Sequence, residues 1–159
     1  MNYRVFGFIT VVMHFAGLGI GLLAILPHSK FHAVCYAGLV VATTLGLVYS
    51  FCAKCPCHWK QCSHVVLGPL ARILPKRKVC PYRPADYWGL GISFFLPAVY
   101  QAPWLWRHPV LPYVFYPLFA ATIAMILWKV CPQCRNVYCP FNRHPGNPKY
   151  HRPPRGNRP

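Results

Sequence analysis

Acidic residues are almost absent from this chain of 159 residues, since Asp86 is the only one against 17 Lys and Arg. Charged residues make up only 11% of the chain, whereas a soluble domain usually carries about 25%. A soluble fold of this size would use acids to balance and solubilise its surface, but a membrane protein is largely covered by lipid. With a single carboxylate, acid–base catalysis by paired acids has almost nothing to work with.

Long apolar stretches are what the chain has instead. Each is close to the ~20 residues that a helix needs to cross ~30 Å of hydrocarbon. They cover residues 5–26, 33–51, 87–106 and 109–130. We therefore expect an all-α integral membrane protein with four transmembrane helices arranged as two hairpins. Residues 1–142 would form this membrane domain with a Cys-rich loop at 52–86, and residues 143–159 would form a basic tail.

Basic residues are distributed very unevenly between the two sides of these spans. One side holds 15 of the Lys and Arg, and the two short connectors on the other side hold only Lys30 and Arg107. Because cytoplasmic segments are enriched in Lys and Arg, we expect both termini and the Cys-rich loop to be cytoplasmic, in a bacterial-type inner membrane. The tail would be extended alone and would favour anionic lipid or an acidic protein partner. Nucleic acid is disfavoured, since no RNA-binding motif accompanies the charge.

An internal repeat is indicated by a shift of 79 residues, which superposes the two halves without a gap. Cys52 falls on Cys131 and Cys55 on Cys134, so the two CxxC motifs coincide. Further coincidences are Thr43 with Thr122, Ala42 with Ala121, Leu39 with Leu118, Phe15 with Phe94 and Arg4 with Arg83. The few identities suggest a duplication, and the paired CxxC motifs are the hardest to attribute to similar composition.

Eight of the nine cysteines lie outside the spans and all on the basic side, while Cys35 is predicted to be a small packing residue within the second span. Two thiolates two residues apart can grip one metal ion or cluster iron, and two such pairs complete a four-coordinate site. The first predicted site consists of Cys52, Cys55, Cys131 and Cys134. The second consists of Cys57, Cys62, Cys80 and Cys139, with His58 or His64 as a substitute ligand.

Other uses of these cysteines remain open. A disulfide framework would require the oxidising side, against the charge bias. Palmitoylation fits juxtamembrane cysteines but does not explain the CxxC spacing, and a catalytic dithiol is also conceivable. Between metals, paired CxxC motifs are usual for zinc, whereas cysteines followed by proline are common in cluster loops; the spacing does not decide, and we favour iron–sulfur slightly.

Several single residues carry further expectations. His14 lies near the middle of the first span, where an ionisable residue is a functional candidate. It would bond either a neighbouring backbone carbonyl, the interpretation that we favour, or a quinone. Asp86 is expected to pair with a nearby Arg such as Arg83, and residues 65–74 to form a short amphipathic helix on the membrane surface. Prolines should bend or break the second hairpin; they are Pro97, Pro103, Pro112 and Pro117.

The function expected from these features is that of an iron–sulfur electron-transfer subunit linking a membrane redox pool, such as quinone, to a partner protein. The chain would be an accessory subunit of a larger membrane complex rather than a catalyst by itself. Two alternatives stay open: a zinc-clamped membrane anchor that recruits a partner, and a protein of heavy-metal uptake or tolerance.

Overall fold

Helices account for nearly all of the regular structure in the computed structural model, which describes residues 3–55, 66–75, 77–78, 82–134, 136, 139 and 141–142. Four of them are long: α1 (Tyr3–Ile25), α2 (Lys30–Ser50), α4 (Pro84–Leu105) and α5 (Leu111–Met125). The last turn of α5 continues as a π-helical segment, η2 (Ile126–Val130). The predicted all-helical class and its two hairpins are therefore confirmed.

Three of the long helices are long and apolar enough to cross a membrane, and they cover Arg4–Ile25, Lys30–Lys54 and Leu111–Gln133. Three of the four predicted spans thus have the length and apolarity that a membrane crossing requires. The remaining helix, α4, is 22 residues long, but Gln101 and two internal prolines interrupt its apolar run. Large apolar side chains cover the outside of the bundle, including Phe31 and Val34 on α2, so this surface is suited to contact with lipid.

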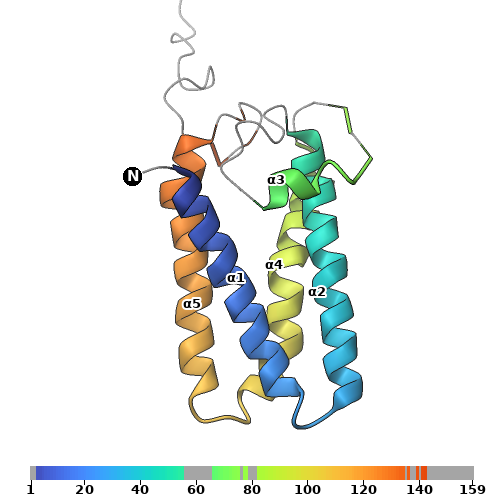
Figure 1. Cartoon of the computed structure of the whole chain (residues 1–159), viewed down its shortest axis with the longest axis vertical. Helices are drawn as coiled ribbons and strands as arrows, with labels where there is room; N and C mark the ends of the chain where they lie inside the picture. The colour runs from blue at the N-terminus through green and yellow to red at the C-terminus, as the bar shows by residue number, and fades with distance from the viewer. Residues whose placement is uncertain are drawn as a thin grey trace, which may run out of the picture.

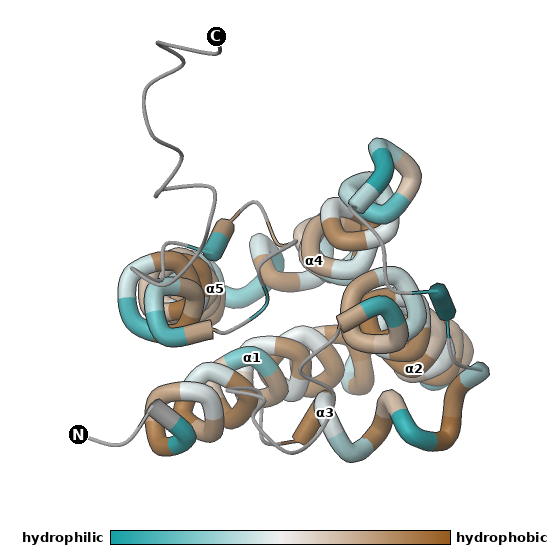
Figure 2. Tube along the Cα trace, turned by 90° about the horizontal axis from the view of Figure 1, so that it is seen from above, coloured by the Kyte–Doolittle hydropathy of each residue, from teal (hydrophilic) through white to brown (hydrophobic). Residues whose placement is uncertain are grey.

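The four helices form one bundle in which the two hairpins are interleaved. Helices α1 and α4 contact each other, α2 packs on α4, and α5 packs on α1. Figure 1 shows α1 crossing the bundle from the side of α5 to the side of α2, and Figure 2 shows the four helices from above. The second helix of each hairpin, α2 or α5, therefore packs on the first helix of the other hairpin, α4 or α1.

The 79-residue repeat proposed from the sequence reappears in this packing. Thr43 and Thr122 are both buried, and each hydroxyl donates to the carbonyl oxygen four residues earlier, on Leu39 and Leu118, at 2.8 Å. Further equivalent positions are buried in both halves. They are Leu18 with Pro97, Ala33 with Pro112, and Tyr36 with Phe115. The two halves thus bury several equivalent positions.

The prolines do not break the second hairpin. Pro97 and Pro103 lie inside a continuous α4, and Pro117 lies inside a continuous α5. Pro112 occupies the first turn of α5, where no intrahelical N–H bond is needed. Missing backbone donors inside a bundle can be tolerated because neighbouring groups re-satisfy the freed carbonyls. The expected break was therefore wrong, and the expected bend stays a prediction.

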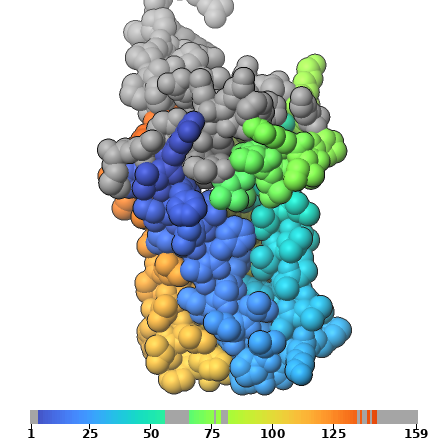
Figure 3. All heavy atoms as spheres, in the orientation of Figure 1, coloured from blue at the N-terminus to red at the C-terminus, as the bar shows by residue number. Residues whose placement is uncertain are grey.

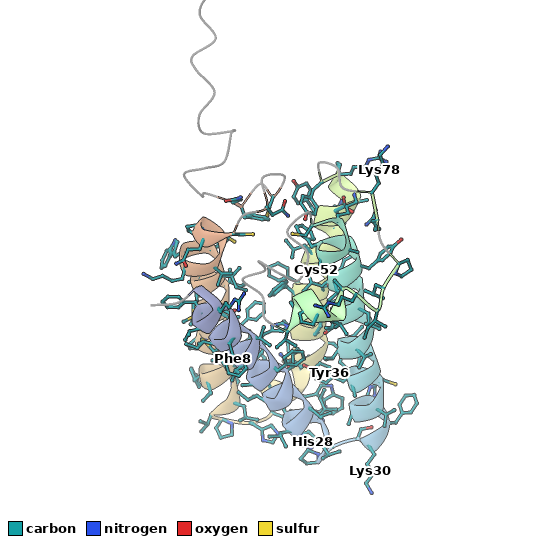
Figure 4. All side chains as sticks on the ribbon, turned by 45° about the horizontal axis from the view of Figure 1, so that its top comes forward. Phe8, His28, Lys30, Tyr36, Cys52 and Lys78 are labelled. Atoms are coloured by element: carbon teal, nitrogen blue, oxygen red, sulfur yellow. The ribbon has the colours of Figure 1, made fainter. Side chains whose placement is uncertain are left out.

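Both connectors lie at one end of the bundle, and both CxxC motifs lie at the other (Figure 1). Figure 4 shows the same polarity, with His28 and Lys30 at one end and Cys52 and Lys78 at the other. The short helix α3 (Leu67–Leu70) lies beside the cysteine end of α2, over the bundle (Figure 3). It is shorter than the predicted surface helix at 65–74, and its buried Gly68 faces the bundle. Cys35 is exposed on α2 and is not a packing residue of the bundle.

Candidate metal centre and its cavity

The two CxxC motifs adopt the same backbone conformation. Each begins with a 3₁₀ turn, η1 (Cys52–Lys54) and η3 (Cys131–Gln133), directly after a long helical segment. The closing cysteines are extended, with φ −71° and ψ 125° at Cys55 and φ −74° and ψ 131° at Cys134. Their N–H groups donate to the carbonyl oxygens of Cys52 and Cys131 at 3.1 and 3.2 Å. Two equivalent dithiol turns therefore stand at the same end of the bundle.

Tyr82 connects the first of these turns to the segment that follows the second. Its hydroxyl donates to the carbonyl oxygen of Phe51 at 3.0 Å and accepts from the amide of Asn136 at 2.8 Å. Its ring stacks on Phe51 with centroids 4.6 Å apart. Burial, together with the nearby charge of Cys55, raises the pKa of Tyr82. The hydroxyl therefore stays protonated and can keep both hydrogen bonds.

The only acid of the chain holds the first turn on its other side. The Asp86 carboxylate bonds Lys54 Nζ at 2.5 Å and an Arg77 guanidinium N–H at 3.0 Å. It also accepts from the backbone N–H of Arg83 at 2.9 Å. Arg83, which we expected to pair with Asp86, therefore bonds it through its backbone N–H. The ion pairs of Asp86 are with Lys54 and Arg77. Lys54 lies between the two cysteines of the first motif and is only 4% exposed, so this ion pair fixes the dithiol turn to the start of α4.

Ionisation of Asp86 is favoured by this arrangement. Burial works against the charged form, but hydrogen bonds from Lys54, from a backbone N–H and from Arg77 outweigh it and hold the pKa of the carboxyl below its usual value. Arg77 adds two further contacts: its backbone N–H donates to Ala53 at 3.3 Å, and its guanidinium lies 4.8 Å from the ring centroid of Tyr49.

A cavity of about 170 Å³ opens beneath the two turns and runs down between the helices. Its lining is mostly apolar, and Leu67, Gly68 and Ala71 of the α3 segment cover part of it. Five pairs of lining residues are related by the 79-residue shift: Val11 with Leu90, His14 with Ser93, Phe15 with Phe94, Leu47 with Ile126, and Cys55 with Cys134. The cavity is therefore lined by equivalent positions of both halves.

Four of the predicted metal-ligating cysteines line this cavity: Cys52, Cys55, Cys134 and Cys139. Cys131, which we assigned to the first site, is half-buried and is not among the lining residues, so Cys139 takes its place in this group. Among the residues that the structure describes, no group of three or more His, Cys, Asp or Glu is arranged to hold a metal ion. The other predicted ligands lie outside the described residues; they are Cys57, His58, Cys62, His64 and Cys80.

His14 lines the same cavity from the middle of α1. Its imidazole lies against the rings of Phe15 and Phe94, with centroid distances of 5.8 and 5.1 Å. The histidine thus shares one cavity with the cysteines, a juxtaposition that their separate positions in the sequence did not reveal.

Sequence reasoning missed a buried polar pair lower in the bundle. The Tyr36 hydroxyl donates to Gln101 Oε1 at 2.7 Å, and both residues are almost fully buried. Gln101 Nε2 has no hydrogen-bond partner within the described residues. It lies beside a second cavity of about 10 Å³, which His14 also lines. A glutamine inside an apolar span was the available signal for this pair.

Comparisons of the chain with protein-family models, with curated proteins and with solved structures found no match. Function is therefore inferred from the residues of this site alone.

Proposed function

We propose that this chain is a membrane-embedded electron-transfer subunit whose cytoplasmic thiolates bind an iron–sulfur centre and pass electrons between the membrane quinone pool and a partner protein. One observation carries the proposal: two dithiol turns of the same conformation stand at one end of the bundle and open on one shared cavity. Two thiolate pairs supply the four ligands that a cluster or a zinc ion requires.

The proposal takes all four long helices as membrane spans. Three meet the length and apolarity required. The outward face of α4 is apolar as well, since Ile92, Phe95, Leu96 and Val99 are exposed there. The excess of Lys and Arg at the cysteine end then predicts, by the positive-inside rule, that this end is cytoplasmic.

The electrostatic surroundings suit thiolates. Metals are ligated by thiolates and not by thiols, and a positively charged environment favours the thiolate. A zinc ion with four thiolates carries a net charge of about −2, and a four-thiolate cluster is likewise anionic. Fifteen basic residues against one acid on this side balance such a charge, and the acid is already paired with Lys54 and Arg77. Because ligand sites rarely form fully without their metal, metal binding would draw the two turns together.

Metal analysis of the full chain, purified anaerobically, tests the proposal. The expected result is brown protein with iron and acid-labile sulfide, and an electron paramagnetic resonance signal after reduction. Cys55→Ser and Cys134→Ser occupy equivalent positions on the two turns, and each should lower the iron content by at least half. Cys35→Ser is the matched control, because Cys35 is exposed on α2 away from the cavity; its iron content should equal that of the wild type. Protein without iron under these conditions would refute the proposal.

A zinc-clamped membrane anchor is the second candidate. The hydrogen bonds of Tyr82 and the ion pair of Asp86 fix the dithiol turns to their surroundings, which a purely structural metal site also requires. This candidate predicts colourless protein with stoichiometric zinc, no redox signal, and loss of helix stability when zinc is chelated.

A further inference from the structure

The surface of the cavity beneath the cysteines is mostly apolar, and two of its polar side chains occupy equivalent positions. His14 on α1 and Ser93 on α4 are related by the 79-residue shift, and both line the cavity. Phe15 and Phe94 are equivalent neighbours of these two residues and also line it. The 79-residue shift therefore relates two hydrogen-bonding side chains and two aromatic rings that line one mostly apolar cavity.

The ring nitrogens of His14 have no hydrogen-bond partner within the described residues, whereas the single hydroxyl proton of Ser93 is already donated and would have to turn to the ligand. Among the described residues, the contacts of the His14 imidazole are with aromatic rings. The Ser93 hydroxyl donates to the carbonyl oxygen of Gly89 at 2.7 Å, and its proton could rotate to another acceptor. An imidazole placed within an apolar bundle at this depth is costly and is expected to have a functional partner.

We propose that this cavity binds the head group of a lipid-soluble quinone, with one carbonyl oxygen hydrogen-bonded to His14 and the opposite one to Ser93. A para-quinone is complementary to this cavity. It has a flat apolar ring and approximate two-fold symmetry, and its two carbonyl acceptors lie at opposite ends of the ring. Phe15 and Phe94 offer aromatic surfaces to the ring. The cavity lies among apolar helices, from which a hydrophobic ligand could enter, and its other end meets the cysteines.

Quinone binding stands on the cavity itself, whereas its use in electron transfer rests on the function proposed above. Oxidation of a bound quinol breaks its two O–H bonds and releases two protons and two electrons. The electrons would pass one at a time through the thiolate-bound centre to the partner protein, which is the final acceptor. One proton would pass to His14 and the other to water. Reduction of a quinone reverses these steps, with electrons supplied by the reduced centre.

Equilibrium binding of a short-chain ubiquinone analogue, decylubiquinone, to the full chain in quinone-free nanodiscs tests the proposal. Wild-type protein should bind saturably above the background of empty nanodiscs. Loss of one hydrogen bond should weaken binding by about threefold to tenfold in His14→Leu and in Ser93→Ala. His14→Gln keeps a donor and should bind more tightly than His14→Leu. His32→Leu is the matched control: it removes an exposed imidazole at the connector end, which bonds Tyr100, and should leave the affinity unchanged.

Three outcomes would overturn the proposal. These are wild-type affinity in a folded His14→Leu variant, photolabelling by an azidoquinone confined to regions away from α1 and α4, and a cavity occupied by phospholipid with no saturable quinone binding. Metal content is measured on the same samples. Metal without quinone binding would refute this inference alone, and quinone binding without metal would refute the proposed electron transfer while leaving the cavity as a quinone site.

Discussion

Replacing the only acid should show how strongly the first dithiol turn depends on it. Asp86→Asn removes the negative charge but keeps an oxygen that can accept from the backbone N–H of Arg83. The substitution therefore measures the contribution of the ion pair separately from the hydrogen bond that caps α4. Its main consequence falls on Lys54, whose ammonium group would remain buried without its counter-ion.

The size of the effect follows from burial. Asp86 is 3% exposed and Lys54 is 4% exposed, and removing one partner of such a buried pair costs about 3–5 kcal/mol because the other charge is left uncompensated. Arg77 is 29% exposed and can turn towards water, so its lost contact should add no more than about 1 kcal/mol. We therefore expect Asp86→Asn to lower the free energy of unfolding by about 3–6 kcal/mol.

Unfolding by denaturant in mixed lipid–detergent micelles, followed by helix content with a metal chelator present, measures this difference. The double variant Lys54→Met with Asp86→Asn removes both charges. Replacing a buried pair by groups that need no charge partner is often close to neutral, so the double variant should recover most of the lost stability.

Arg77→Gln is the control for the partly exposed contact, with an expected loss of about 0–1 kcal/mol. The reasoning would be refuted if Asp86→Asn cost no more than Arg77→Gln. It would equally fail if the double variant were as unstable as Asp86→Asn, because the two substitutions would then show no favourable coupling.

Three further predictions concern other contacts. Gly21→Ala would place a Cβ 1.5 Å from Gln101 Oε1 and should destabilise the bundle by about 1–3 kcal/mol in the same assay, whereas Gly19→Ala meets nothing within 4 Å and should not destabilise it. Tyr82→Phe removes the hydroxyl that joins the two cysteine-bearing segments and should speed maleimide labelling of cysteines at that end severalfold; an unchanged rate would contradict the bridge. Because the pKa of Asp86 is lowered in the folded state, its stabilisation is fully present above about pH 4 and is lost as pH falls through the folded pKa, a loss that should be missing in Asp86→Asn.

Much of the fold could be predicted because apolarity over about 20 residues has few structural solutions in a membrane. The helices begin and end within a few residues of the expected spans; α2, for example, begins at Lys30 after its N-cap Ser29, whose side chain accepts from the N–H of His32. The equivalence of the two halves could also be predicted from Cys52 and Cys131, because the two CxxC motifs have the same spacing and lie 79 residues apart.

The site was only partly predictable, because sequence spacing shows which cysteines share a turn and not what lies between turns. The two CxxC motifs were predicted to lie together, and their common conformation and shared cavity agree with that. The role of Tyr82 as a bridge depends on side-chain geometry across 54 positions to Asn136, for which the sequence holds no signal. Broken helices were wrongly expected at the prolines because propensity describes an isolated helix, whereas packing in the bundle overrides it.

Positions at which the two halves differ locate the specialised chemistry. Residues that the halves share, such as Thr43 with Thr122 and Phe15 with Phe94, build the bundle and the walls of the cavity. The counterpart of Asp86 in the first half is Gly7, so only one of the two dithiol turns is fixed by an acid.

The cavity shows the same asymmetry, because the counterpart of His14 is Ser93. A symmetric cavity would treat both ends of a quinone alike. An imidazole at one end and a hydroxyl at the other give that ligand a preferred orientation and one site for proton transfer. Ser93→His would restore symmetry, and we expect it to retain quinone binding while losing the preference of an asymmetric azidoquinone for one helix. Unchanged partition of the label between α1 and α4 would show that His14 does not orient the ligand.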